Sequence, residues 1–312
     1  MNEVSRKILE QVNSVIIGKE AVTEKVLMAV LAQGHVLLED VPGVGKTTMA
    51  LAFARTLGLD SRRVQFTSDT MPSDIIGFSL YNKETGRFDY KSGAVMTNLL
   101  LADEINRTSS KTQSALLEAM EEYQVTVDGH TYPLPKPFVV LATQNPVGSA
   151  GTQLLPSSQL DRFMIRTTMG YPDRQSQVDI LRERHHENPL DRLQGVVTCE
   201  ELLELIENAK QVHIADAVYD YIVDLVDATR SSELVELGVS PRGALALCRM
   251  AKAHAFVRGG DFVTPEDVYQ VFDDVCAHRL VLSAKARLGK ITAREITEQL
   301  RQQVPVPQVA QL

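Results

Sequence analysis

The chain has 312 residues, 44% apolar and 23% charged, which is enough apolar sequence for one sizeable core and a second, smaller one. Its formal net charge of −8 argues against a surface built to neutralise the phosphates of nucleic acid. No run approaches the roughly 18 apolar residues of a membrane span, and the N-terminus lacks the pattern of a signal peptide. We therefore expect a cytoplasmic protein of two domains, for which nucleic acid is an unlikely partner.

The first part of the chain alternates between helical and strand-like patterns. Helices are predicted at residues 18–34, 47–58, 108–123 and 157–163. Strands are predicted at residues 35–39, 62–68, 98–104, 137–146 and 164–172. Residues 77–95 and 124–134 each alternate around a glycine-containing turn, which predicts two hairpins. This order of elements is typical of an α/β domain with a parallel sheet.

After about residue 188 the pattern becomes helical. Thr198 and Glu201 have the spacing of a capping box, and later helical segments begin with Ser or Thr followed by Pro. We therefore divide the chain into an α/β domain of residues 1–188 and a smaller, all-helical domain of residues 189–312, which ends in a loose tail.

Residues 35–50, HVLLEDVPGVGKTTMA, contain most of a phosphate-binding loop. Such a loop binds polyphosphate because successive backbone N–H groups and a helix N-terminus converge on the anion. The residues expected to bind the nucleotide here are Pro42, Gly43, Val44, Gly45, Lys46, Thr47 and Thr48. Lys46 would reach the β- and γ-phosphates, and the Thr47 hydroxyl would ligate Mg²⁺. A glycine-rich turn without a ligand is the alternative.

Asp40 stands where the first glycine of such a loop is usually found. This position precedes the N–H groups that bind phosphate and mainly ends the strand. We therefore expect the Asp40 carboxylate to turn back onto nearby backbone, which would leave the loop intact.

Acidic and amide side chains follow two further predicted strands. Asp103 and Glu104 end the strand at 98–104, and neighbouring residues at a strand end point in different directions. Asp103 is predicted to hold Mg²⁺, while Glu104 orients and deprotonates the attacking water. Asn145 would position the same water, although Asn-Pro is also typical of a turn. Because open α/β sheets bind ligands at the carboxyl ends of their strands, these residues predict one ATP site.

Two arginines are predicted to complete the site. Arg162 lies at the end of a short helix, from which it could reach the γ-phosphate bound by a neighbouring subunit; an ordinary surface ion pair is the alternative. Arg242 follows Ser240 and Pro241 at the start of a helix in the second domain, and we expect its side chain where that helix meets the phosphates. Arg107 is the second candidate for an arginine that acts on a neighbour.

These segments, in this order and spacing, resemble the MoxR family of AAA+ ATPases, in the helix-2-insert clade. The resemblance covers nearly the whole chain through LLEDVPGVGKT, LLLADEINR, KTQSALLEAMEE, VLATQNP, QLDRF and SPR. It implies a five-stranded parallel sheet of order 5-1-4-3-2, a helical lid, Mg-ATP, and a ring, usually a hexamer, with each site at a subunit interface. It also implies that Ile16, Ile17 and Gly18 pack on adenine, although ordinary core packing explains them equally well.

The family implies a chaperone-like ATPase that remodels, matures or metallates partner proteins, often proteins with a von Willebrand factor A domain. The two hairpins would then bind the substrate protein, or else they would be surface elements without a role in binding.

Two other functions fit the motifs. One is a nucleotide-switched binding scaffold with little turnover, which the intact Glu104 and Arg162 argue against; the other is a nucleic-acid translocase, which the acidic balance and 5% aromatic content argue against.

Overall fold

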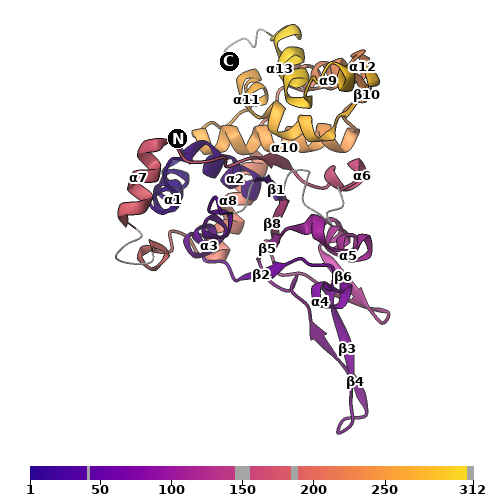
Figure 1. Ribbon diagram of the computed structural model, residues 1–312. Helices are drawn as coiled ribbons and strands as arrows, with labels where there is room; N and C mark the ends of the chain where they lie inside the picture. The colour runs from indigo at the N-terminus through magenta and orange to yellow at the C-terminus, as the bar shows by residue number, and fades with distance from the viewer. Residues whose placement is uncertain (41–42, 145–154, 184–188, 308–312) are drawn as a thin grey trace.

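A five-stranded parallel sheet forms the centre of the computed structural model, which describes residues 1–40, 43–144, 155–183 and 189–307 (Figure 1). Its strands lie in the order β2-β5-β8-β1-β9. They are β1 Val36–Glu39, β2 Ser61–Gln65, β5 Leu99–Asp103, β8 Val139–Gln144 and β9 Ile165–Thr167. When these strands alone are numbered along the chain, their order from the β9 edge is 5-1-4-3-2, as the family resemblance implies.

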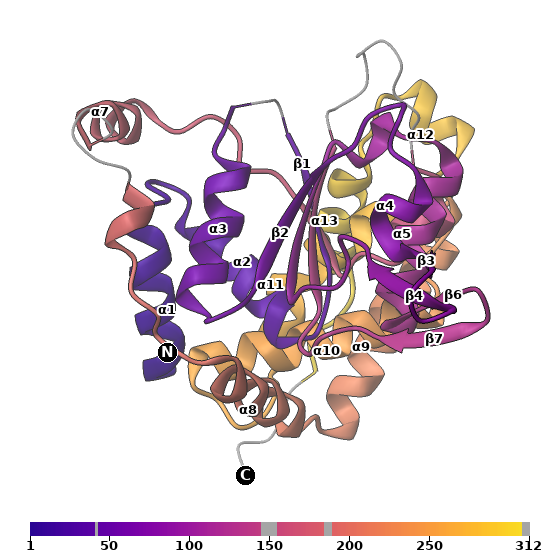
Figure 2. The same cartoon turned by 90° about the horizontal axis from the view of Figure 1, so that it is seen from below.

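Strands β1, β5 and β8 are buried on both faces because their successive residues enter two different apolar cores. Leu38 and Leu101 belong to one core, while Leu37 and Leu100 belong to the other. Before the last third of the chain, the helices that contribute to the first core are α1 Glu3–Asn13, α2 Glu20–Leu31 and α3 Lys46–Thr56. The second face is covered by α4 Pro72–Ile76 and α5 Ser110–Glu122, so that the sheet is the middle of three layers (Figure 2).

Both predicted hairpins are present. The first joins β3 Gly77–Asn82 to β4 Arg87–Ser92, and the second joins β6 Gln124–Val127 to β7 His130–Pro133. The β3–β4 hairpin extends away from the sheet at the end opposite the C-terminal helices (Figure 1). Its large apolar side chains are exposed: Phe78 by 49%, Leu80 by 53%, Tyr81 by 52% and Phe88 by 73%.

The last part of the chain is a helical lid. Its helices are α8 Cys199–Gln211, α9 Asp216–Ser231, α10 Pro241–Arg258, α11 Pro265–Cys276, α12 Ala284–Leu288 and α13 Ala293–Gln303. The predicted capping box of Thr198 and Glu201 begins α8, and boxes at Thr264 and Thr292 begin α11 and α13. The remaining short elements are α6 Ser157–Leu160, α7 Arg174–Glu183 and the 3-10 helices Ile105–Arg107, Pro189–Arg192 and Ala277–Arg279.

The prediction of an all-helical lid was wrong in one detail. The segments β10 Val235–Leu237 and β11 Val281–Leu282 form a small antiparallel sheet between the helices. They are too short and too far apart in sequence to show a strand pattern, and pairing satisfies backbone groups that no helix uses.

The lid and the sheet domain share an apolar core. Residues of α8, α10 and α11 belong to the same buried cluster as α2 and β1, and α10 lies against both α2 and α8. The division after residue 188 therefore stays a prediction. Within the described ranges, no helix has both the length and the apolar character of a membrane-spanning segment.

Candidate nucleotide site and a separate arginine cavity

The phosphate-binding loop enters α3 through two glycines in the left-handed backbone region. Gly43 has φ +86° and Gly45, the N-cap of α3, has φ +96°; side chains other than that of glycine rarely permit this conformation. A Cβ atom on Gly43 would meet no atom within 4 Å, so the loop borders open space. The N-terminus of an 11-residue helix therefore faces a cavity, as phosphate binding requires.

The cavity brings together the loop and the acidic strand end. It is lined by Gly43, Gly45, Lys46, Thr47, Thr48, Arg63, Gln65, Asp103, Glu104 and Thr143, which come from the carboxyl ends of β2, β5 and β8 and the start of α3. Val44 instead packs against the apolar core. Pro42 and Asn145 lie outside the described residues, so their predicted roles stay predictions.

Asp40 behaves as the sequence predicts. Its Oδ2 atom accepts hydrogen bonds from the backbone N–H groups of Met169, at 2.5 Å, and Gly170, at 2.7 Å. Asp40 is 7% exposed, and these bonds satisfy its buried charge. The residue that replaces the usual glycine thus joins the loop to the segment after β9.

Lys46 lies within the field of three carboxylates. Its Nζ atom donates a hydrogen bond to the backbone oxygen of Asp40 at 2.9 Å. Burial lowers the pKa of Lys46 from its ordinary value, while the charges of Asp40, Asp103 and Glu104 oppose this shift. The ammonium group is therefore held at the base of the loop, where an anion would compensate its lost hydration.

The two acidic residues have different partners. Asp103 accepts a hydrogen bond from Arg63 Nε at 2.8 Å and from Thr143 Oγ1 at 3.2 Å. Glu104 has the left-handed φ of +56°, and its backbone N–H donates to Thr143 Oγ1 at 2.9 Å. The strained backbone directs adjacent carboxylates to separate contacts, and such strain is concentrated at functional sites.

The Glu104 carboxylate is held by two donors from its own chain. Its Oε2 atom accepts from Gln65 Nε2 at 2.9 Å and from Arg107 Nη1 at 2.7 Å. Arg107 therefore contacts an acidic residue of the cavity in its own chain. This position does not favour a role for Arg107 at the nucleotide of a neighbouring subunit.

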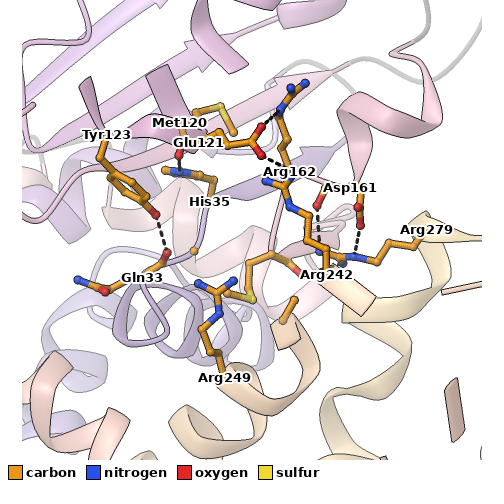
Figure 3. Close-up of a pocket in the computed structure, with 13 residues that line it drawn as sticks. Gln33, His35, Met120, Glu121, Tyr123, Asp161, Arg162, Arg242, Arg249 and Arg279 are labelled. Atoms are coloured by element: carbon orange, nitrogen blue, oxygen red, sulfur yellow. Dashed lines mark hydrogen bonds and ion pairs between the residues drawn. The ribbon is translucent and has the colours of Figure 1, made fainter. Parts of the chain in front are cut away.

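A second cavity, which we call the arginine cavity, contains the other two predicted arginines (Figure 3). Glu121 joins them: its Oε2 atom lies 2.7 Å from Arg162 Nε, and its Oε1 atom lies 3.0 Å from Arg242 Nη1. Gly34 and His35, which precede β1, also line this cavity. It therefore lies at the amino edge of the sheet, whereas the nucleotide cavity lies at the carboxyl edge.

This placement corrects the expectation that Arg242 meets the phosphates of its own chain. The four residues of β1 separate the two cavities, and a strand of that length spans roughly 13 Å. Helix α10 begins at the amino edge because Ser240, its N-cap, contacts Asp161 there. The sequence did not reveal this position of Arg242, because a helix cap determines the residue at which a helix begins but not the edge of the sheet that the helix approaches.

Comparison with known proteins agrees with this geometry. Residues 35–165 match the model of the ATPase family associated with various cellular activities (AAA), and residues 227–300 match the AAA lid domain. The chain is 40% identical to Chaperone MoxR1 of Mycobacterium tuberculosis, with 99% of this chain and 84% of that protein covered. The chain belongs to the MoxR family of AAA+ ATPases.

Two further relatives extend over nearly the full length of this MoxR-family protein. YeaC of Bacillus subtilis is 46% identical and covers 96% of this chain, with 94% of its own length aligned. A crystal structure of a candidate ATPase from Cytophaga hutchinsonii is 39% identical, with a TM-score of 0.90 over 97% of this chain and 94% of that one. The similarity thus includes the lid as well as the sheet domain.

The donor set of the MoxR-family cavity fits Mg²⁺. The Thr47 hydroxyl and the Asp103 carboxylate line the same cavity and are hard oxygen donors, which this ion prefers. The open space above Gly43 and the N-terminus of α3 suit a polyphosphate. ATP and Mg²⁺ are therefore compatible with the residues present.

Sequence reasoning missed three residues of this cavity: Arg63, Gln65 and Thr143. Arg63 and Gln65 are two positions apart on β2, so they project to one side of the strand, and Gln65 pairs in register with Asp103. That alternation was available in the sequence. Their use in the site depends on β2 and β5 being neighbours, and spacing along the chain does not reveal this.

The predicted adenine contacts lie on a segment next to α7. Ile16 is 5% exposed and belongs to the apolar core. Gly18 has φ +71° and lies so close to α7 that an added Cβ atom would be 2.2 Å from Ser176 Oγ. Ile17 is partly exposed. An adenine role for Ile16, Ile17 and Gly18 stays a prediction.

His35 is buried beside the arginine cavity in its neutral form. Its Nδ1 atom accepts the Val140 N–H at 3.0 Å, so the proton resides on Nε2, which donates to the Met120 carbonyl at 2.9 Å. Burial, and to a smaller extent Arg249 and Arg242, lower the pKa of His35 to about 4. Protonation of Nδ1 would break the bond to Val140.

We therefore predict a pH-dependent contribution of His35 to stability. The unfolded chain binds this proton near pH 6.5 and the folded chain only near pH 4, so the unfolded state holds more protons between these values. The free energy of unfolding should fall by up to about 3 kcal/mol through this group as the pH falls from about 6.5 to about 4. Urea denaturation of wild type and His35→Gln should give curves that converge toward low pH. Parallel curves would contradict the assignment.

Proposed function

We propose that this MoxR-family protein hydrolyses Mg-ATP in a ring, with the arginines of each protomer acting on the nucleotide of the next, and that it uses this cycle to remodel partner proteins. One observation carries the proposal. The phosphate-binding loop and the pair Arg162 and Arg242 lie at opposite edges of the same sheet. A single chain therefore holds two incomplete halves of a site.

The residues at the carboxyl edge would bind and position the substrate. The N–H groups of the loop and the Lys46 ammonium would bind the β- and γ-phosphates of ATP. Thr47 and Asp103 would hold Mg²⁺, which when bound neutralises charge on the phosphate oxygens. Glu104, oriented by Gln65 and Arg107, would accept a proton from the attacking water.

The arginine cavity would supply positive charge to a second copy of the chain. An arginine contributed from a neighbour increases phosphoryl transfer by about 10³- to 10⁵-fold in well-studied GTPases. Arg162 and Arg242 are the residues that fit this role, since they lie at the opposite edge of the sheet from their own nucleotide cavity, whereas Arg107 contacts Glu104 of that cavity. A closed ring, for which the family favours a hexamer, lets every protomer both give and receive these arginines.

A protein partner is supported by the exposed β3–β4 hairpin. Its aromatic and aliphatic side chains form an apolar surface on a protruding element, which suits contact with a polypeptide more than with phosphates. Chaperone MoxR1 is named for such an activity. The partner class that the family favours is a protein with a von Willebrand factor A domain, to be matured or metallated at this ring.

Glu104→Gln should retain ATP binding and lose turnover, because the amide keeps the shape of the carboxylate but cannot accept the proton. We expect kcat to fall by about 10²- to 10⁴-fold, the usual range for a general base. Lys46→Ala is the matched comparison and should lose binding itself in a titration with a fluorescent ATP analogue. Wild-type protein that binds ATP without turnover would favour the binding scaffold, and strong stimulation by DNA would favour the translocase.

Mixing two inactive variants tests the assignment in trans. Lys46→Ala protomers keep the arginine pair, and Arg162→Ala protomers keep the loop, so mixed rings should recover part of the wild-type turnover. Each variant alone should stay inactive at the same protein concentration. If rings shown by mass spectrometry to contain both variants recover no activity, Arg162 does not act on a neighbour.

A further inference from the structure

Arg279, a buried lid residue, contacts the segment that carries Arg162. Its side chain is 3% exposed, and its Nε atom lies 2.8 Å from Asp161 Oδ1. Its Nη2 atom donates to the backbone oxygens of Phe163, at 2.8 Å, and Asp161, at 3.2 Å, and its Nη1 atom donates to that of Met164 at 3.2 Å. One guanidinium thus binds the main chain on both sides of Arg162.

The same segment is also tied to the start of α10, which carries Arg242. Asp161 Oδ2 accepts a hydrogen bond from Ser240 Oγ at 3.3 Å, while Ser240 caps α10 by accepting the Gly243 N–H. Asp161 therefore bridges Arg279 on one carboxylate oxygen and the helix cap on the other. Figure 3 shows Asp161 and Arg279 beside the pair that Glu121 joins.

Helix α10 leaves room for this arrangement at Gly243. A Cβ atom on Gly243 would lie 2.8 Å from Arg279 Cδ and 3.2 Å from Arg279 Nε. The same Cβ atom would lie 2.6 Å from Val239 Cγ1, so a larger residue would press on both Val239 and the Arg279 side chain. The first turn of the helix that bears Arg242 and the residue that holds the Arg162 segment are therefore packed against one another.

We propose that Arg279 and Asp161 are positioning residues that fix Arg162 and Arg242 as one rigid pair, presented together to the nucleotide of the next protomer. This inference rests on the proposed function in trans. An arginine acting on a developing phosphate charge must be held close to its productive geometry, and a displacement of about 1 Å costs on the order of 10²-fold in rate. Five hydrogen bonds from Arg279 and Ser240 to Asp161, Phe163 and Met164 supply that rigidity at the wall of the arginine cavity.

The competing explanation is that Arg279 and Asp161 only attach the lid to the sheet domain. Kinetic measurements distinguish this structural role from the positioning of the two arginines. Asp161→Asn keeps the size of the side chain but removes the charge that binds Arg279. We expect kcat to fall by about tenfold or more, with the affinity for ATP within about twofold of wild type, because the loop lies at the other edge of the sheet. Glu233→Gln is the matched control, since it removes an exposed lid ion pair with Lys285 far from Arg162 in the sequence and should change neither value.

A mutant cycle and a mixing experiment complete the test. Adding Asp161→Asn to a variant that lacks both arginines, Arg162→Ala with Arg242→Ala, should cause no further loss of the residual kcat, and Asp161→Asn protomers should regain turnover when mixed with Lys46→Ala protomers. Three outcomes would each overturn the inference. They are a further loss of kcat when Asp161→Asn is combined with loss of the arginines, a kcat of Asp161→Asn within about twofold of wild type, and weaker ATP binding by Asp161→Asn. If Asp161→Asn does not assemble, Gly243→Ala decides by the same criteria, because its methyl group would press on Arg279 and Val239 without removing a charge. Should Arg162→Ala itself retain turnover, the proposed function fails instead.

Discussion

The polarity of the parallel sheet is the constraint on which the rest of the structure depends. Every strand of the sheet runs in the same direction, so loops that follow strands gather at one edge and loops that precede them gather at the other. The phosphate-binding loop, Asp103 and Glu104 all follow strands. Arg162 precedes β9, and it therefore lies at the amino edge. The separation of the two cavities is a direct result of this polarity.

Strand β9 connects the two edges and is fastened at both ends. Before it, the carbonyls of Phe163 and Met164 accept hydrogen bonds from Arg279, and the Met164 N–H donates to His35. After it, the Met169 and Gly170 N–H groups bind Asp40. The three residues of β9 thus connect the segment of Arg162 to the segment that binds Asp40 of the phosphate-binding loop. The buried charges of Arg279 and Asp40 hold the two ends of the strand in place.

Buried polar groups do most of this positioning. Asp40, Asp103 and Arg279 are each less than a tenth exposed, and each forms hydrogen bonds with the protein partners named above. Loss of a partner leaves a buried charge uncompensated, which costs more than the bond itself contributes. The geometry of both cavities is therefore set by groups that cannot easily adopt other arrangements.

Local pattern predicted the five strands of the sheet, both hairpins and the helices α2, α3, α5 and α6, because apolar periodicity, caps and turn residues act over a few neighbouring positions. It also predicted that Lys46, Thr47, Asp103 and Glu104 line one cavity. Helices α1, α4 and α7 were not predicted. The sequence predicted that the Asp40 carboxylate binds backbone groups, but it did not predict that these groups belong to Met169 and Gly170. The β10–β11 pairing was not predictable, since its two strands are short and separated by three helical segments and more than forty residues of chain.

The sequence by itself determined the chemical composition of the nucleotide site, since a loop of glycines, a lysine and adjacent acids has its character before the chain folds. Only the tertiary structure decided which side chains share a cavity. Arg63 reaches Asp103 through the pairing of β2 with β5, and Glu121 joins Arg162 to Arg242 across three elements distant in sequence. These contacts depend on the order of strands and on the edge that each helix approaches, and such long-range geometry leaves no local pattern in the chain.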